Sequence, residues 1–350
     1  MTNQDIAQHR LNNQHIAGEL LETPHDVVKY MGAMQAQDYA GAKWAIGLRL
    51  QNGNDVDIDN AMANGSIIRT HVLRPTWHFI SPADARWMLD LTASRIKAAS
   101  VPWYKKLELD VTVLHKSNKV LANALEGGKQ LNRAEITIVL QQAGIVTDDL
   151  RFMLLLMHAE LDKVICSGAR QGKQFSYALF DDSVPSAPPK SKEESLAELA
   201  KRYFISRGPA LVQDFTWWSG LTTTDAKTGF ELVKHTLNNI KVDGKDYWAT
   251  AIQQQLREQT GTAYLLPAFD EFAVAYKDRT ATVNDKYLEE ARHVIFDPSI
   301  IIDNQVVGTW KRTITKNDVN IVLNPFGKLN LAQTKAVEAA MERYRKFMIA

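Results

Sequence analysis

The chain has 350 residues, of which 45% are hydrophobic and 23% charged, so it lies in the ordinary globular range and is long enough for two or three cores. Its single cysteine, Cys166, excludes an internal disulfide and a structural zinc site built on four cysteines or on two cysteines and two histidines. The net charge is only +1, so any nucleic-acid site must come from a segregated basic face.

The N-terminal sequence lacks a basic region followed by an apolar core, as an export signal would require. The longest apolar run, near residues 152–157, is too short to span a bilayer. We therefore expect a cytoplasmic protein that does not enter the membrane.

The first 110 residues are expected to form helices followed by a hairpin. The pattern predicts helices at residues 13–21, 24–34 and 57–63. Two strands, residues 67–73 and 76–80, then meet at Arg74-Pro75. Helices followed by a hairpin are typical of a winged helix, so residues 1–110 are assigned as a first winged-helix unit.

Residues 111–183 give the clearest winged-helix pattern. Asn132 can cap a helix that ends at Gly144, and Asp148-Asp149 can begin a second helix. Two apolar segments around a Gly-rich loop, residues 164–166 and 175–179, then predict a hairpin with its turn in the loop.

A Pro-, Ser- and Lys-rich stretch, residues 184–192, indicates a linker. After it, residues 193–250 predict a third winged helix. Its helices are expected at residues 193–206, from Gly208-Pro209 to residue 218, and at 222–235, and its hairpin turns on Asp243-Gly244.

Residues 251–350 predict a small β-rich module and a terminal helix. Short apolar runs occur at residues 265–266, 294–296, 300–302, 306–307 and 319–323. Asp303-Asn304 is a plausible turn. From Thr334 onward, Val337, Met341, Tyr344 and Phe347 share one face of an amphipathic helix.

The predicted fold class is thus α+β, with three tandem winged-helix units. Such units often bind duplex nucleic acid, because a helix N-terminus and a glycine-tipped wing can both reach phosphates. A protein–protein scaffold is the alternative.

The candidate DNA-contacting residues are Arg69, Arg74, His78, Arg170, Lys173, Lys311 and Arg312. His78, between Trp77 and Phe79, is by default a packed core histidine.

Several common chemistries have no support in the sequence. It contains no Walker-type glycine loop, no His-Glu-x-x-His and no Gly-x-Ser-x-Gly. The carboxylates Asp38, Asp84, Asp270 and Asp278 are scattered, which argues against a two-magnesium nuclease. We expect no metal and no cofactor.

Gln35 and Gln37 are the candidate catalytic residues. They follow the helix that carries Met31 and precede Tyr39-Ala40-Gly41, which is expected to break it. In extended backbone, a spacing of two puts both amides on one side. An amide orients a water or a sugar but cannot act as a strong general base. The pair therefore suits a leaving group that is already activated, such as a cationic N-alkylated purine. The alternative is an ordinary capping or solvated pair.

Five segments in this order resemble the AlkZ/YcaQ-like winged-helix DNA glycosylases, over nearly the whole chain. They are Met34-Gln35-Ala36-Gln37-Asp38, the stretch Arg69-Thr70-His71-Val72-Leu73-Arg74-Pro75-Thr76-Trp77-His78, Gly208-Pro209-Ala210 with Asp214-Phe215-Thr216-Trp217-Trp218-Ser219-Gly220, Leu265-Leu266-Pro267-Ala268-Phe269-Asp270, and Val307-Gly308-Thr309-Trp310.

The resemblance implies a monofunctional DNA glycosylase whose three winged helices form a concave cradle for duplex DNA. Such enzymes excise N-alkylated purines, and some unhook interstrand crosslinks. The family's catalytic Gln-x-Gln pair maps onto Gln35 and Gln37, which places the chain in the Gln-x-Gln branch rather than the one with Asp at the second position. The expected partner is duplex DNA with alkylated or crosslinked purines, bound by a monomer. Pro75 stands where the family commonly has Gly, which weakens any transfer of hairpin contacts.

A non-enzymatic winged-helix regulator remains the rival hypothesis. In such a protein the glutamines would cap a helix or touch phosphate. A regulator would ordinarily dimerise and prefer one DNA sequence strongly.

Overall fold

The computed structural model describes residues 1–250, 261–294, 296–315 and 318–349. The chain divides into two compact units, each described here by itself. Met1–Ile58 and Leu196–Ala350 form what we call the terminal unit, and Asp59–Ser195 form the middle unit. The first ten residues of the expected C-terminal module, 251–260, lie outside the described residues. Among the described residues, no helix is long and apolar enough to cross a membrane.

The chain begins with a helix earlier than the sequence predicts. Thr2 and Asp5 form a capping box that starts α1 (Asn3–Asn13), and the buried face of α1 carries Ile6 and Leu11. The helix expected at residues 13–21 is wrong, because the chain turns there with positive φ values, among them 54° at His15.

The next helix, α2 (Pro24–Met31), begins at Thr23, whose side chain accepts a hydrogen bond from Asp26 N–H. It ends three residues earlier than expected, because Gly32 takes a φ of 73°. Strand β1 (Ala33–Gln35) follows directly. Tyr39 does not break a helix as expected but begins one, α3 (Tyr39–Gly47). The strand has already separated the two helices.

Residues 192–249 of the chain form helices followed by a hairpin, as expected. The helices are α10 (Lys192–Arg207), α11 (Val212–Ser219) and α12 (Thr223–Val233), and the strands are β7 (Asn238–Val242) and β8 (Lys245–Ala249). The expected turn at Asp243-Gly244 is confirmed, with φ values of 48° and 75°.

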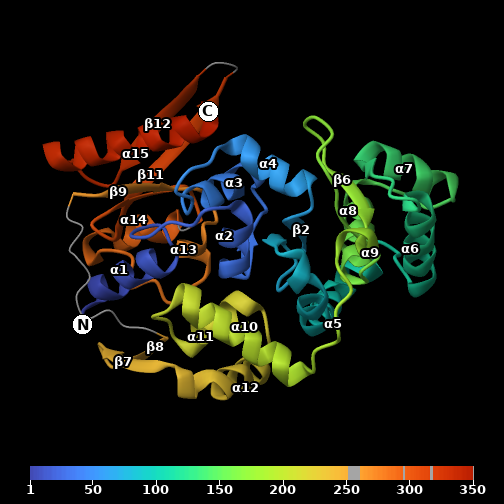
Figure 1. The fold of residues 1–350 in the computed structure, drawn as a ribbon, viewed down its shortest axis with the longest axis horizontal. Helices are drawn as coiled ribbons and strands as arrows, with labels where there is room; N and C mark the ends of the chain where they lie inside the picture. Colours follow the sequence, from blue (N-terminus) through green and yellow to red (C-terminus); the bar gives the residue numbers. More distant parts are fainter. Residues whose placement is uncertain (251–260, 295, 316–317, 350) are drawn as a thin grey trace. The chain divides into compact units, whose positions relative to one another are not determined.

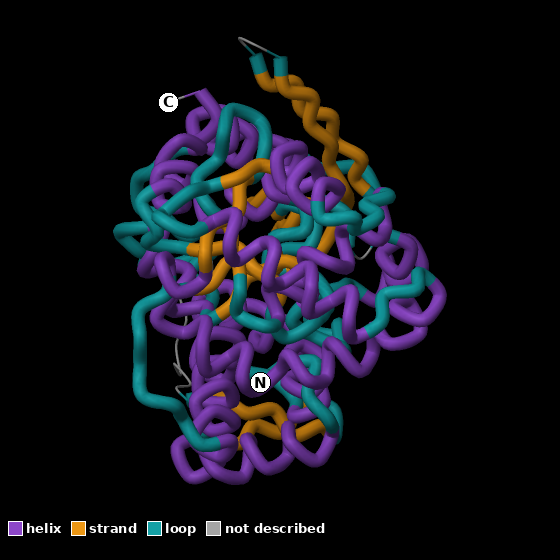
Figure 2. The backbone as a smooth tube through the Cα atoms, turned by 90° about the vertical axis from the view of Figure 1, so that its right-hand side faces the viewer, coloured by secondary structure: helices purple, strands orange, loops and turns teal. Residues whose placement is uncertain are grey.

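The C-terminal part of the terminal unit is a four-stranded antiparallel sheet in the order β12-β11-β10-β9. Its strands are β9 (Ala263–Leu266), β10 (Ser299–Ile302), β11 (Gln305–Ile314) and β12 (Val319–Pro325). The turn at Asp303-Asn304 is confirmed, with both φ values positive. Figure 2 shows β11 and β12 extending as a two-stranded ribbon beyond the rest of this sheet.

One expected strand of this module is wrong. Val294 follows α14 (Leu288–His293) and donates its N–H to Ala291 O, so it ends that helix. Residue 295 lies outside the described residues. The remaining helices here are α13 (Glu271–Val274) and α15 (Leu331–Ile349).

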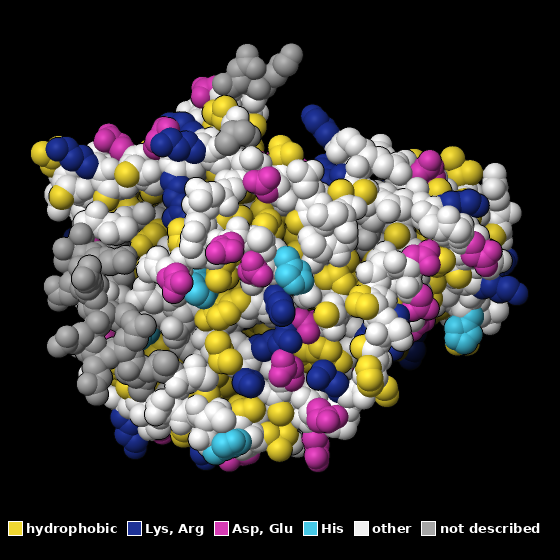
Figure 3. All heavy atoms as spheres, in the orientation of Figure 1, with side chains coloured by type: hydrophobic (Ala, Val, Ile, Leu, Met, Phe, Trp, Pro, Cys, Tyr) yellow, Lys and Arg dark blue, Asp and Glu magenta, His cyan; other side chains and the backbone are white. Residues whose placement is uncertain are grey.

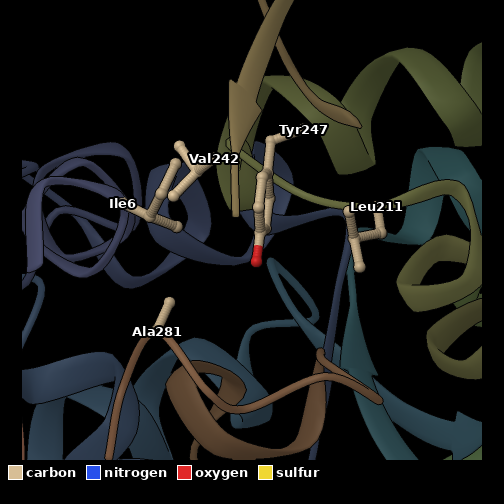
Figure 4. Packing of buried hydrophobic residues seen from close by; sticks show 5 residues of the cluster. All are labelled: Ile6, Leu211, Val242, Tyr247 and Ala281. Atoms are coloured by element: carbon tan, nitrogen blue, oxygen red, sulfur yellow. The ribbon is translucent and has the colours of Figure 1, made fainter. Parts of the chain in front are cut away.

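The expected C-terminal helix is confirmed, since α15 buries Val337, Tyr344 and Phe347. It packs against β9, β12 and α3 (Figure 1). A second apolar cluster joins the start of the chain to distant segments of the same unit. Figure 4 shows it: Ile6, Leu211, Val242, Tyr247 and Ala281. The terminal unit is therefore assembled from both ends of the chain.

The middle unit begins within α4 (Asp55–Ala63) and contains the first expected hairpin. Its strands, β2 (Ile68–His71) and β3 (Trp77–Ile80), pair antiparallel around Arg74-Pro75, although both are shorter than expected. A long helix, α5 (Pro82–Lys106), follows. Nothing in the sequence pattern had indicated it.

The rest of the middle unit combines four helices with a small sheet in the order β4-β6-β5. The elements are α6 (Val111–Leu125), β4 (Leu131–Asn132), α7 (Arg133–Gln142), α8 (Asp149–Leu161), β5 (Ile165–Ser167), β6 (Ser176–Leu179) and α9 (Phe180–Ser183). Asn132 caps α7 with Glu135 in a capping box, and Asp148 caps α8, as expected. Residues 184–191, within the expected linker, contain no helix or strand.

Candidate active site

Gln35 and Gln37 lie on a short extended segment between α2 and α3. Gln35 ends β1, and Gln37 follows in a bend before α3. Burial alternates along this segment: Met34 and Ala36 are 1% and 0% exposed, Gln35 is half-buried and Gln37 is exposed. The alternation is that of extended backbone whose two glutamines share a face.

A buried ion pair contacts the backbone of this segment. Glu271 Oε1 accepts a hydrogen bond from Gln35 N–H at 2.9 Å, and Glu271 Oε2 lies 2.6 Å from Arg207 Nη2. Arg207 Nη2 also donates to Ala33 O, and its Nη1 to Met31 O, each at 2.7 Å. The side chains of Arg207 and Glu271 are 0% and 1% exposed. The pair therefore hydrogen-bonds three main-chain groups: Met31 O, Ala33 O and Gln35 N–H.

Two aromatic side chains contact the residues of the pair. Trp218 Nε1 donates to Glu271 Oε2 at 2.9 Å, and the Arg207 guanidinium lies 4.3 Å from the centre of the Trp218 ring. Tyr276 donates its hydroxyl proton to Arg207 O at 2.8 Å. Burial raises the pKa of Tyr276 to about 12, so its phenol stays protonated as a donor at neutral pH.

The segment before Glu271 attaches the sheet to α3. Leu265 O accepts a hydrogen bond from Trp44 Nε1 on α3 at 2.7 Å, and Leu266 O accepts one from Trp310 Nε1 at 2.8 Å. Asp270 pairs with Arg49 at 2.9 Å, and both side chains are at most 1% exposed. Both the strand and the helix that border Gln37 are therefore attached to residues 265–271.

Asp38, next to Gln37, occupies the N-cap position of α3, and its carboxylate faces a basic side chain. Arg312 Nη2 on β11 lies 3.5 Å from Asp38 Oδ2. A Cβ added at Gly41 would lie 2.5 Å from the same Asp38 oxygen, so glycine leaves room for this carboxylate. Of the two basic candidates on β11, Arg312 therefore lies at the site, while Lys311 is exposed on the strand.

The candidate DNA contacts of the first hairpin lie largely beneath the surface. Arg69 is 6% exposed, between the rings of Trp77 and Phe175 at 4.3 and 4.5 Å. His78 is 0% exposed, and its Nδ1 lies 2.9 Å from Thr76 O. Arg74 is half-buried. His78 is a packed histidine in this structure.

The candidates on the β5–β6 loop are more accessible. Arg170 donates from Nη2 to Lys173 O at 2.8 Å and lies 3.8 Å from Asp59. Lys173 is exposed. On the face of the molecule in Figure 3, Lys and Arg side chains lie among Asp and Glu side chains. Within the described residues, no group of three or more His, Cys, Asp or Glu side chains could hold a metal ion.

Sequence reasoning missed Arg207, Trp218 and Glu271. Each stands inside or beside a segment that had been noted for other reasons. Arg207 precedes Gly208-Pro209, and Glu271 follows Asp270. The hydrogen bonds from Arg207 and Glu271 to residues 31–35 span 174 to 236 positions of the chain, so no local spacing could have revealed them.

The arrangement defines a class of site: two amides, which do not titrate, on a backbone whose hydrogen bonds go to a buried ion pair. Such a site can orient a water and a sugar and can stabilise developing charge, but it cannot abstract a proton strongly. It fits hydrolysis of a bond whose leaving group already carries positive charge.

Comparison with known proteins identifies the family. The model of the family described as "DNA glycosylase AlkZ-like" matches residues 28–347. The chain is 22% identical to an interstrand DNA cross-link repair glycosylase of Streptomyces sahachiroi over 94% of this chain and 92% of that protein. It also matches the solved structure of the S. sahachiroi DNA glycosylase AlkZ with a TM-score of 0.78 and 20% identity, covering 99% and 96% of the two chains. The chain belongs to the AlkZ-like family of DNA glycosylases, hydrolases that act on N-glycosyl bonds. This decides for the enzyme over the regulator.

Proposed function

We propose that this chain is a monofunctional DNA glycosylase that hydrolyses the N-glycosidic bond of cationic N-alkylated purines in duplex DNA. The observation that carries the proposal is the Gln35-Ala36-Gln37 segment, whose two glutamines lie on extended backbone held by buried charges. The family match over residues 28–347 supports it.

In the proposed reaction, Gln35 and Gln37 orient a water and the deoxyribose. The oxygen of the water forms a bond to C1′ while the bond from C1′ to N9 of the purine breaks. The electron pair of that bond moves to the base and cancels its positive charge, and the water gives up a proton to solvent. Because the base leaves neutral, no general acid is needed, and the enzyme contributes mainly position and electrostatics.

We further propose that the substrates extend to bulky adducts and interstrand crosslinks. Support comes from the Gln-x-Gln pattern and from the crosslink repair activity named for the S. sahachiroi relative. A crosslinked base cannot readily be turned out into a closed pocket, so cleavage would occur with the lesion still near the duplex.

We propose that three winged-helix units bind the DNA: residues 1–110, 111–183 and 193–250. Residues 184–192 would be a linker, and residues 251–350 the C-terminal module. The helices and hairpins seen in each stretch support this assignment. Of the basic candidates, the exposed Lys173 and Lys311 and the partly accessible Arg74, Arg170 and Arg312 are the ones we propose to contact phosphate.

The test is incubation with a duplex that contains N7-methylguanine or a nitrogen-mustard crosslink, followed by alkaline cleavage of abasic sites. We expect product with the wild type and its loss with Gln35→Ala and Gln37→Ala. Gln142→Ala, which removes an exposed amide from α7, is the matched control and should cleave normally. Absence of wild-type product on every alkylated substrate, with tight sequence-specific binding, would overturn the proposal.

A second assay tests the monofunctional mechanism. Borohydride reduction during the reaction should trap no covalent protein–DNA adduct, because no amine attacks C1′ in the proposed mechanism. Trapping of an adduct, or strand nicking that depends on a lysine, would contradict it.

A further inference from the structure

We propose that the buried Arg207–Glu271 pair is a positioning unit that fixes the backbone of residues 31–35 and thereby orients Gln35 and Gln37. The inference rests on the proposed function, since it assigns the pair a role in the reaction of those glutamines. Neither Arg207 nor Glu271 is proposed to touch the substrate, because both side chains are at most 1% exposed.

The pair contacts β1 where a neighbouring strand would ordinarily bind. In a strand, the C=O of one residue and the N–H of the residue two positions on point to the same edge. Arg207 donates to Ala33 O at 2.7 Å, and Glu271 accepts from Gln35 N–H at 2.9 Å. Two side chains thus take the place of a strand at this edge of β1, and the last contact is on the backbone of Gln35 itself.

The Arg207 guanidinium also hydrogen-bonds the end of α2. Nη1 donates to Met31 O, and Nη2 donates both to Ala33 O and to Glu271. Only the planar fork of arginine presents its donors in this arrangement, whereas a lysine ammonium is a single compact donor group. Gly32, whose φ is 73°, lies between these two carbonyls. One arginine side chain therefore hydrogen-bonds the backbone on both sides of this bend.

An ion pair of the middle unit offers a comparison. Lys97 contacts Asp162, whose carboxylate also lies 3.1 Å from His158 Nε2 and accepts a hydrogen bond from Asn118 Nδ2 at 2.7 Å. None of these contacts is made with residues 31–38. If an ion pair served only to stabilise the fold, replacing either pair would leave cleavage by the folded protein unchanged. The proposal says that replacing the Arg207 pair slows cleavage, whereas replacing the Lys97 pair does not.

The experiment compares Arg207→Met/Glu271→Met with Lys97→Met/Asp162→Asn. Replacing both partners avoids an unpaired buried charge, so the double variants should fold. The measurements are affinity for a duplex with N7-methylguanine, single-turnover cleavage rate at saturating enzyme, and hydrogen exchange of the Gln35 amide by overlapping peptides.

For the Arg207 double variant we expect cleavage about 100-fold slower, because small displacements of positioning groups have effects of that size. DNA affinity should be unchanged, and the Gln35 amide should exchange faster. The Lys97 double variant should keep the wild-type cleavage rate and the wild-type exchange of the Gln35 amide. A folded Arg207 double variant that cleaves at the wild-type rate, or whose Gln35 amide is still protected, would overturn the proposal.

Arg207→Lys keeps the positive charge and serves if the double variant does not fold. It should bind DNA normally but cleave more slowly, and a wild-type rate would again contradict the proposal. Failure of the proposed function appears differently: the wild type would then release no alkylated base. The exchange of the Gln35 amide would still show whether the pair holds this segment.

Discussion

The candidate active-site segment, residues 31–38, and the helices and hairpin at residues 131–179 are built in opposite ways. In the latter, Asn132 caps α7 with Glu135, and Asp148 caps α8, all within three residues. In the former, the contacts that fix the backbone come from Arg207 and Glu271, far along the chain. The structure of residues 131–179 thus depends on side chains close in sequence, whereas that of residues 31–38 depends on buried charged residues far along the chain.

The difference implies that substitutions in the two regions should have different consequences. Changes at the distant charged residues should alter both stability and cleavage, because those residues hold the catalytic backbone. Changes at the caps of α7 and α8 should alter stability alone. Stability and cleavage, measured on the same variants, therefore distinguish the two regions.

Glu271→Ala should lower the free energy of unfolding by about 3–5 kcal/mol, because it leaves the buried Arg207 charge unpaired. Denaturant unfolding measures the loss. The variant lacking both charged groups should be more stable than this single variant. A single variant as stable as the wild type would mean that the pair does not hold this region.

Asp162→Asn tests whether the middle unit also depends on a charge network. Asp162 contacts Lys97 on α5, His158 Nε2 at 3.1 Å and Asn118 Nδ2 at 2.7 Å. We expect a loss of about 1–2 kcal/mol at pH 7, allowing for the quarter of the carboxylate that water reaches.

The effect of Asp162 should depend on pH. Burial opposes its charge, but hydrogen bonds from His158 and Lys97 outweigh burial and hold the pKa of this carboxyl well below its ordinary value. A lowered folded-state pKa stabilises the protein above the unfolded-state pKa, about 4, and this contribution is lost as the pH falls further. The difference between variant and wild type should therefore shrink in unfolding experiments below pH 4. A constant difference would contradict the assignment.

Asn132→Ala removes the cap of α7 and should cost about 1 kcal/mol of stability. Thermal unfolding measures the loss. Cleavage per folded molecule should not change, since the cap is not part of the active-site segment. Slower cleavage by the folded variant would break the distinction between the two regions.

Lys173→Ala should have the smallest effect on stability, within about 0.5 kcal/mol, because the side chain is exposed on the β5–β6 loop. If it contacts phosphate, the slope of log affinity against log salt should fall by about 1. Gln174→Ala, an exposed uncharged neighbour, is the control. An unchanged slope for Lys173→Ala would remove this residue from the DNA surface.

Much of the scaffold was predictable because its determinants are local. The capping box at Asn132, the turn at Asp243-Gly244 and the apolar face of α15 were each recognisable within a few residues. The wrong elements were also local in origin. The helix expected at residues 13–21 fails because Thr2 and Asp5 start the helix earlier, and a positive φ at His15 follows its end.

The site was only half predictable. Gln35 and Gln37 were proposed from their amide chemistry and from the family pattern, which are properties of the sequence. Arg207 and Glu271 were missed because an arginine at the end of a helix usually remains solvated. Its burial follows from its contacts with Trp218 and Glu271, which only the folded chain brings together.

The catalytic role proposed for Gln35 and Gln37 requires both side chains for base release. The decisive measurement is the single-turnover rate of 7-methylguanine release from a duplex, detected by mass spectrometry, for the wild type, Gln35→Ala and Gln37→Ala. We predict release of the intact base by the wild type and a rate at least about 100-fold lower in each variant. Wild-type rates in both folded variants, or no release by the wild type, would contradict the central claim.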